Sequence, residues 1–305
     1  QKIQSIQDLM RVPLKDVDIL NWKQQKDLNI EMSSNWIKED FEDAVVKAKE
    51  FIKKGDIFQI VISQKFKTEL KNKPFDLYRS LRMVNPSPYM AFFDFGTWFL
   101  IGSSPEVMVK AEKIKNNKII ANLRPIAGTR PRGTDSIEDA QNENDLLSDP
   151  KEISEHVMLV DLGRNDLGKV CEIGSLEVKD LMIIEKYSHV MHIVSNVVGD
   201  YNKKFTKFKS LLAGFPAGTV SGAPKIRAME IIDELETTKR KVYAGGIGYF
   251  SANGEFDTCI ALRTAVAKND KFYVQAGAGI VADSKPLKEY EETVNKAKAL
   301  INALK

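Results

Sequence analysis

The sequence of 305 residues is poor in cysteine, histidine and tryptophan, with two, three and three residues respectively. Cys171 and Cys259 lie far apart, and neither stands in a Cys-x-x-Cys motif. The sequence therefore argues against a disulfide scaffold and a zinc site, and a reducing, cytoplasmic setting is expected. No apolar run approaches the roughly 20 residues that a membrane span needs, and no signal peptide is recognisable. We expect no membrane as a partner.

An excess of charge of one sign is also lacking. The 45 Lys and Arg residues nearly balance the 42 Asp and Glu residues, for a formal net charge of +3. Basic residues are interleaved with acidic ones, which is typical of solvated helix faces, so no nucleic-acid partner is expected. With 43% hydrophobic residues, the chain can bury the core of one large domain or of two.

The two ends of the chain differ in pattern. The first residue is Gln1 rather than Met, so we expect a fragment of a longer protein. Residues 1–34 are polar and weakly periodic, which predicts a linker or the remnant of a missing N-terminal region. Residues 35–305 carry the periodic patterns of helices and strands and are expected to form the functional domain.

These patterns predict an α+β fold with largely antiparallel sheets, because hairpin-linked strands alternate with helices. A helix is expected from Asp40 to Gly55, and another from the N-cap pair Asp149-Pro150 to about residue 162 or a little beyond. Asn253-Gly254 predicts a hairpin. The expected strands and the terminal helix lie at 57–66, 175–186, 189–199, 248–251, 256–266, 271–277 and 286–303.

A loop of small residues precedes a helix in the run from Phe215 to Glu236. Thr219 supplies a hydroxyl group, Gly218 is a backbone hinge, and Pro224 suits the first turn of a helix. Such a helix start can hold an anion, but taken alone the run is more simply explained as an ordinary loop-to-helix junction. The run lacks the Gly-Lys-Ser/Thr ending of a P-loop, so it gives no support for ATP binding.

Two pairs of glutamates repeat one spacing. Glu152 and Glu155 are three residues apart on one expected helix, and Glu289 and Glu292 are three apart on another, with Lys296 one turn further. If the two helices face each other, four carboxylates meet in one cavity. Such a cluster, with little histidine, favours Mg²⁺. The alternative is that these are solvated surface acids.

Three further side chains could take part in chemistry. Alternation in the strand 256–266 places Arg263 above small residues, where a guanidinium can bind a carboxylate, although a surface arginine is an equal alternative. His192 lies within a strand and could transfer protons, or it could be a core residue. Alternation in the strand 57–66 directs Gln59, Val61, Ser63 and Lys65 away from Phe58, Ile60, Ile62 and Phe66.

Taken together, the chain resembles the chorismate-utilising enzymes, and among them the large subunits of anthranilate synthases. The resemblance rests on motifs spread in order from about residue 40 to the end of the chain. They are Gly55-Asp56-Ile57-Phe58-Gln59, Asn85-Pro86-Ser87-Pro88-Tyr89-Met90, Arg124-Pro125-Ile126-Ala127-Gly128-Thr129-Arg130-Pro131-Arg132-Gly133, Ser154-Glu155-His156, Asp161-Leu162-Gly163-Arg164-Asn165-Asp166, the Gly218–Lys225 loop, Asp257-Thr258-Cys259, Gln275-Ala276-Gly277-Ala278-Gly279 and Glu292-Thr293-Val294-Asn295-Lys296.

The resemblance implies a sandwich of antiparallel sheets with outer helices, residues 35–305 being the chorismate-binding catalytic domain. It implies Mg²⁺ held by Glu155 and Glu292, with support from Glu152 and Glu289. The other implied roles are enolpyruvyl-carboxylate binding by Arg263, Tyr249, Gly277 and Gly279, substrate binding by Lys296, elimination assisted by His192, and an ammonia site lined by Thr129 and Thr219.

Three positions separate the sub-families. Isochorismate and salicylate synthases carry a lysine at the position of Gln59 to activate water, and an amide cannot serve as that base. Aminodeoxychorismate synthases typically carry a lysine in place of Ala127 and an asparagine in place of Val61. The resemblance therefore favours anthranilate synthase, a carbon–oxygen lyase, over aminodeoxychorismate synthase, and both over a non-catalytic chorismate- or tryptophan-binding protein.

The resemblance also implies a second chain. Nothing in the sequence is similar to a glutaminase with its cysteine nucleophile, so ammonia is expected from a separate glutamine amidotransferase subunit in a hetero-oligomer. Family members typically have an N-terminal Leu-Leu-Glu-Ser motif that helps to bind tryptophan. Leu146-Leu147-Ser148 is only superficially similar and is expected to be helical, which leaves feedback inhibition open.

Overall fold

The computed structural model describes residues 2–13, 30–187 and 190–302. Its core consists of two seven-stranded antiparallel sheets, which confirms the predicted α+β class. Sheet A contains, in spatial order, β1 (Ser33–Ser34), β2 (Gln59–Glu69), β14 (Lys271–Ile280), β13 (Thr264–Lys268), β4 (Phe99–Ser104) and β3 (Tyr89–Asp94), with β10 (Gly222–Ala223) paired to β2. Sheet B contains β11 (Gly246–Phe250), β12 (Phe256–Ile260), β5 (Val107–Lys113), β6 (Ile119–Leu123), β9 (Val190–Asp200) and β7 (Ile126–Pro131), with β8 (Glu177–Lys186) paired to β9.

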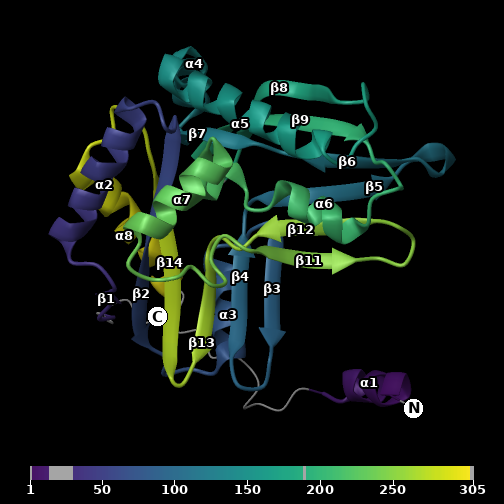
Figure 1. The fold of residues 1–305 in the computed structure, drawn as a ribbon. Coiled ribbons are helices and arrows are strands. Elements are labelled where there is room, and N and C mark those ends of the chain that lie inside the picture. The colour runs from purple at the N-terminus through teal and green to yellow at the C-terminus, as the bar shows by residue number, and fades with distance from the viewer. Residues whose placement is uncertain (1, 14–29, 188–189, 303–305) are drawn as a thin grey trace.

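Helices cover both sheets, as Figure 1 shows. Along sheet A, α8 packs on β14 and α2, and α3 packs on β3 and β4; along sheet B, α5 packs on β6, β7 and β9. The helices are α1 (Lys2–Arg11), α2 (Lys38–Lys53), α3 (Pro74–Val84), α4 (Ser136–Ser148), α5 (Pro150–Gly168), α6 (Lys207–Gly214), α7 (Lys225–Leu235) and α8 (Pro286–Ile301), with short 3-10 turns η2 (Lys115–Asn117) and η3 (Gly218–Val220). In the part of the chain that is described, none of them combines the length and the apolar character that a membrane crossing requires.

The start of α5 follows from its sequence. The Asp149 side chain accepts hydrogen bonds from the backbone N–H groups of Lys151 and Glu152, and Pro150 fills the first helical position. This is the predicted cap, and it satisfies two N–H groups that would otherwise lack partners. The helix continues to Gly168, about six residues beyond the predicted end. Its first turns therefore carry Glu152 and Glu155 in a fixed orientation.

The predicted alternation in β2 is confirmed, with one exception. Ile60, Ile62 and Phe66 are buried in apolar clusters against α2 and α8, while Gln59 and Ser63 are buried on the opposite face. A strand buried on both faces belongs in the middle of a layered core. Phe58 is the exception, because it precedes the strand and is 70% exposed.

The predicted strand 256–266 is wrong as a single element. The chain leaves sheet B after Ile260, crosses to sheet A, and re-enters a strand at Thr264. Arg263 lies in the crossing with a positive φ of 45°, and its carbonyl accepts a hydrogen bond from the Ser103 N–H. The predicted alternation of Arg263 with Asp257 and Cys259 on one face therefore does not exist, because a residue in a left-handed conformation breaks the pleat.

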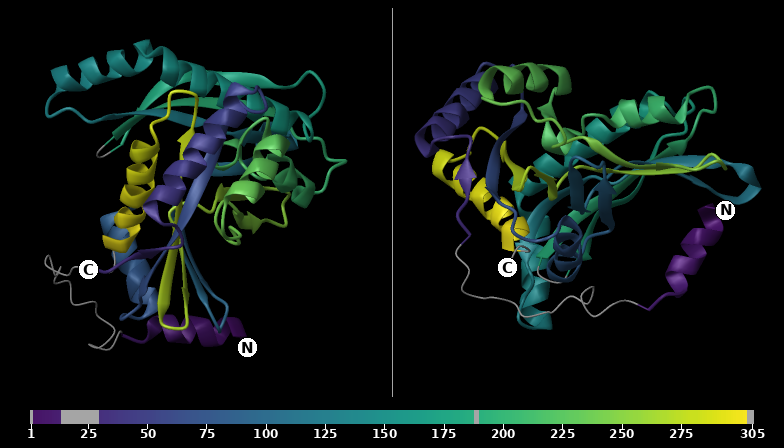
Figure 2. Two further views of the ribbon diagram at one scale, coloured as in Figure 1. Left: turned by 60° about the vertical axis from the view of Figure 1, so that its left-hand side comes forward. Right: turned by 90° about the horizontal axis from the view of Figure 1, so that it is seen from below.

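The first 34 residues contain more structure than the predicted linker. Residues 2–11 form helix α1, whose side chains are all exposed, and Ser33–Ser34 pair with Phe66 and Lys67 of β2. Figure 2 shows α1 apart from the two sheets. The central part of the predicted linker, residues 14–29, lies outside the described residues.

Candidate active site

A hydrogen bond between side chains joins the two sheet layers next to the predicted metal ligands. Gln59 Nε2, from β2 of sheet A, lies 3.0 Å from Glu155 Oε1, from α5 on sheet B. The carboxylate can only accept, which orients the amide nitrogen toward Glu155 and the amide oxygen away from it. That buried oxygen has no hydrogen-bond partner among the described residues. Gly279 leaves the space for this amide, since a Cβ there would lie 2.8 Å from Gln59 Nε2.

The four predicted carboxylates lie in two pairs, one on α5 and one on α8. Burial and the neighbouring Glu155 raise the pKa of Glu152 on α5. Burial and Glu292 raise the pKa of Glu289 on α8, and Lys151 of α5 partly offsets this rise. The charge of Arg130, whose Nη1 lies 3.7 Å from Glu152 Oε1, lowers the pKa of Glu152 against the effect of burial.

A divalent cation fits the chemistry of this cluster. Within the described residues, no group of three or more His, Cys, Asp or Glu side chains is arranged so that it could hold a metal ion. Carboxylate oxygens are ligands that Mg²⁺ prefers, and this ion usually keeps water and substrate oxygens among its other ligands. Glu292 currently forms an ion pair with Lys296, at 2.6 Å between Oε1 and Nζ. Lys296 Nζ also donates to the carbonyl of Gly277 at 3.0 Å.

His192 lies on β9 opposite Thr129 of β7. Its Nδ1 is 3.0 Å from both the Gly128 carbonyl and Thr129 Oγ1. A carbonyl oxygen can only accept, so Nδ1 carries the hydrogen and Nε2 keeps a free lone pair. Burial lowers the pKa of His192, and the charge of Arg263 lowers it further. The imidazole is therefore neutral at pH 7 and can act as a base through Nε2.

The charge of Arg263 reaches His192, although Arg263 lies in the crossing between β12 and β13 and not in the predicted continuous strand. Burial of its guanidinium group lowers the pKa of Arg263. Strand β14 continues to Ile280, three residues past its predicted end. Gly277 and Gly279 therefore lie inside the strand, opposite Ser63 and Val61 of β2. The site thus spans β2, β14 and the crossing that follows β12.

Tyr249 is not among the side chains that the structure brings together. It lies on β11 opposite Asp257, with 62% of its surface exposed. A different tyrosine, Tyr243, is buried beside Gly277, where a Cβ would lie 2.8 Å from the Tyr243 hydroxyl. Burial raises the pKa of Tyr243 to about 12. The hydroxyl is therefore a neutral hydrogen-bonding group. The sequence around Tyr243, Tyr-Ala-Gly-Gly, contains no pattern apart from its glycines that would have indicated this role.

Glu106 is the second residue that the sequence patterns did not indicate. It precedes β5, and its Oε1 accepts a hydrogen bond from Thr219 Oγ1 at 2.8 Å. Burial raises the pKa of Glu106 to about 7, against the opposing effects of Thr219 and the charge of Lys296. At neutral pH a large fraction of this carboxyl group is protonated and can donate a proton. The one sequence feature that could have indicated Glu106 is its position as a single acidic residue after Ser-Pro, between two apolar stretches.

Comparisons with known proteins identify the family of the chain. The sequence profile of a family described as chorismate binding enzyme matches residues 7–302. Anthranilate synthase component 1 of Synechocystis is 56% identical over 294 residues, which are 95% of this chain and 58% of that protein. The chain therefore spans a little more than half the length of this curated relative.

Solved structures show the same fold. The crystal structure of anthranilate synthase component I from Streptococcus pneumoniae matches with a TM-score of 0.87 and 45% identity, over 98% of this chain and 65% of that one. The menaquinone-specific isochorismate synthase of Escherichia coli matches with a TM-score of 0.82 and 23% identity, over 99% of this chain and 68% of that one. The second likeness shows the fold alone.

Proposed function

The chain belongs to the family of chorismate-binding enzymes, and on this premise we propose that it catalyses the anthranilate synthase reaction. In this reaction, chorismate and ammonia form anthranilate, pyruvate and water, with Mg²⁺ as the cofactor. We choose ammonia over water as the nucleophile because the Gln59 amide is buried and hydrogen-bonded to Glu155. A neutral amide cannot deprotonate water, so ammonia, which needs no such activation, is the fitting nucleophile.

The residues of the site have complementary binding roles. Glu155 and Glu292 would hold Mg²⁺, with Glu152 and Glu289 beside them. When bound, the ion would offset the charge of the ring carboxylate of chorismate. Arg263 and Tyr243 would bind the enolpyruvyl carboxylate beside Gly277 and Gly279, and the raised pKa of Tyr243 keeps its hydroxyl a donor.

Amination requires that a ring hydroxyl leaves, and Glu106 is placed to protonate it. Its raised pKa keeps the proton available at neutral pH, and the Thr219 hydroxyl fixes the orientation of the carboxyl group. Gln59 and Thr129 would line the side from which ammonia adds. The free oxygen of Gln59 can accept a hydrogen bond from ammonia, because Glu155 already engages the amide nitrogen.

Elimination of pyruvate requires that the ring loses a proton, which restores aromaticity. The Nε2 lone pair of His192 is the base for this step, since its Nδ1 hydrogen is committed to the Gly128 carbonyl. The lowered pKa of His192 keeps the base unprotonated before the step. We further infer that a glutamine amidotransferase subunit supplies ammonia in a hetero-oligomer, as the name component 1 of the relatives implies a second component.

The choice of nucleophile is tested at Gln59. The parent chain should form little isochorismate, even without ammonium. Gln59→Lys should lower anthranilate formation by about tenfold or more and permit measurable addition of water, because burial favours a neutral amine that can act as a base. Glu155, 3.0 Å from the present amide, opposes this by favouring the charged amine. Chromatography of products with and without ammonium measures both reactions.

A matched control is Gln59→Met, which removes the hydrogen bond without adding a base. It should weaken anthranilate formation and produce no isochorismate. Abundant isochorismate from the parent chain would overturn the assignment to anthranilate synthase. Equal product patterns for the parent and Gln59→Lys would show that Gln59 does not face the substrate.

The pH dependence of the reaction tests Glu106. The charged and titratable neighbours that act on this carboxyl group are Lys296, which lowers its pKa, and Tyr243, whose own pKa it raises. Because the acid form is lost as the pH rises through about 7, kcat/KM for chorismate should fall above that pH at a fixed concentration of free ammonia. Thr219→Val removes a bond that favours the ionised form, so the fall should move to higher pH. A profile unchanged in Glu106→Gln would assign the proton donation to another group.

A further inference from the structure

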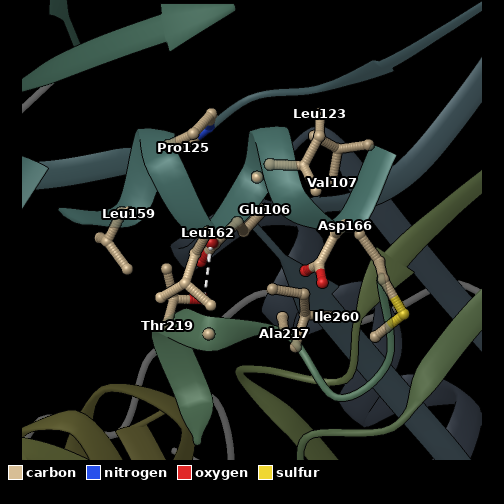
Figure 3. A pocket seen from close by; sticks show the side chains of 13 residues that line it. Glu106, Val107, Leu123, Pro125, Leu159, Leu162, Asp166, Ala217, Thr219 and Ile260 are labelled. Atoms are coloured by element: carbon tan, nitrogen blue, oxygen red, sulfur yellow. Dashed lines mark hydrogen bonds between the residues drawn. The ribbon is translucent and has the colours of Figure 1, made fainter. Parts of the chain in front are cut away.

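A small cavity lies beside the Glu106–Thr219 pair, lined by α5, η3 and strands β5, β6 and β12 of sheet B. It offers about 30 Å³ to water-sized molecules. Most of its wall is apolar, with side chains contributed by Val107, Met108, Leu123, Pro125, Leu159, Leu162 and Ile260. Figure 3 shows Glu106 hydrogen-bonded to Thr219 on one side of this space and the carboxylate of Asp166 on another. The cavity therefore combines apolar walls with a few polar groups.

The cavity has the size and the partners that a water molecule needs. A buried water requires on the order of 10–15 Å³ and two to four hydrogen-bond partners. Glu106, Thr219 and Asp166 can each form a bond to a molecule inside. The side chain of Asp166 is 4% exposed and already accepts from Lys225 at 2.6 Å and Lys169 at 3.1 Å, which leaves further lone pairs on its oxygens.

Glu106 links this cavity to the residues that the proposed function assigns to substrate binding. It is affected by the charge of Lys296 and itself affects Tyr243, and both of these side chains contact Gly277. The same carboxyl group lines the cavity. A water molecule formed at Glu106 would therefore be released next to the cavity.

The proposed reaction must release one water molecule. Atom balance between chorismate plus ammonia and anthranilate plus pyruvate leaves one oxygen and two hydrogens. In the amination step, the carbon–nitrogen bond forms, the ring double bond shifts, and the carbon–oxygen bond to the ring hydroxyl breaks with its electron pair. Glu106 gives its proton to the departing oxygen, and the added nitrogen then returns one proton to the carboxylate. Water remains beside Glu106.

We propose that this cavity is the site that receives the water expelled during amination. The inference rests on the proposed function. Ammonia is the other small neutral molecule that would fit, but a carboxylic acid at the entrance would protonate it and trap it as an ammonium–carboxylate pair. The apolar wall would also disfavour the ion. A donor acid beside a cavity of this size suits a leaving group rather than an incoming base.

Filling the cavity from two walls tests the proposal. Ala217→Val adds two carbons from the η3 side and Val107→Leu adds one from β5. Each should slow chorismate amination by about tenfold, because the expelled water stays beside the ring and can add back. Neither should change the conversion of the purified amino-enolpyruvyl intermediate to anthranilate by more than about twofold, because that step releases no water. Ala267→Val, a buried change on β13, is the control and should alter neither rate.

Crystal structures of the parent and of Ala217→Val supply a second readout. The parent should hold an ordered water bonded to Glu106 and Thr219, and the variant should hold none. Filled variants that aminate as fast as the parent, or that lose both steps equally, would overturn the role of the cavity. A parent chain that forms no aminated product would instead contradict the proposed function itself.

Discussion

Glu292→Gln should lower the turnover of chorismate by about a thousandfold, the equivalent of roughly 4 kcal/mol of transition-state stabilisation. Glu292 lies on α8 near Glu289, and Glu155 lies on α5, so each helix contributes a carboxylate that the other cannot replace. The amide keeps the shape of the side chain but removes its charge. Turnover should be measured over a range of Mg²⁺ concentrations.

The loss in Glu292→Gln should not come from unfolding. Glu292 is an exposed side chain whose partner is Lys296, and the free energy of unfolding should change by less than about 1 kcal/mol. Glu291→Gln, an exposed neighbour on the same helix, is the matched control and should retain parental turnover. Full activity of Glu292→Gln, or parental turnover in EDTA, would refute the metal assignment.

His192→Met should stop the reaction after amination. Without the Nε2 base, loss of the ring proton should slow by about a hundredfold to ten-thousandfold, while Gln59, Thr129 and Glu106 still support addition of ammonia. The amino-enolpyruvyl intermediate should accumulate, and pyruvate should not appear. Mass spectrometry of the quenched reaction detects the intermediate directly.

The role of His192 can be separated from its structural contacts. His192→Asn can still donate a hydrogen bond to the Gly128 carbonyl, as Nδ1 does, but it has no base. It should therefore stall in the same way as His192→Met. Normal anthranilate output from His192→Asn would show that the hydrogen bond, and not the proton transfer, is what the reaction needs.

Local sequence signals predicted the parts of the site that depend on neighbouring residues. The cap at Asp149, the three-residue spacing of Glu152 and Glu155, and the alternation that buries Gln59 all appear in the structure. Each of these depends on interactions within about one helical turn or one strand, which sequence patterns capture well.

The parts that failed depend on contacts between distant segments. Arg263 was assigned to a strand because the residues around it have strand-forming side chains, but the chain there changes from one sheet to the other. The strand partner is a non-local choice that propensity does not encode. Glu106 and Tyr243 were missed for the same reason, because burial against η3 and β14 gives them their properties.

The central claim is tested most directly by the products of the 305-residue chain incubated with chorismate, Mg²⁺ and ammonium. Fluorescence identifies anthranilate, and mass spectrometry with a pyruvate assay gives the stoichiometry. The proposed site predicts equal amounts of anthranilate and pyruvate. Aminodeoxychorismate as the product would assign the chain to the neighbouring activity, and chorismate that is bound but not converted would show a binding protein rather than an enzyme.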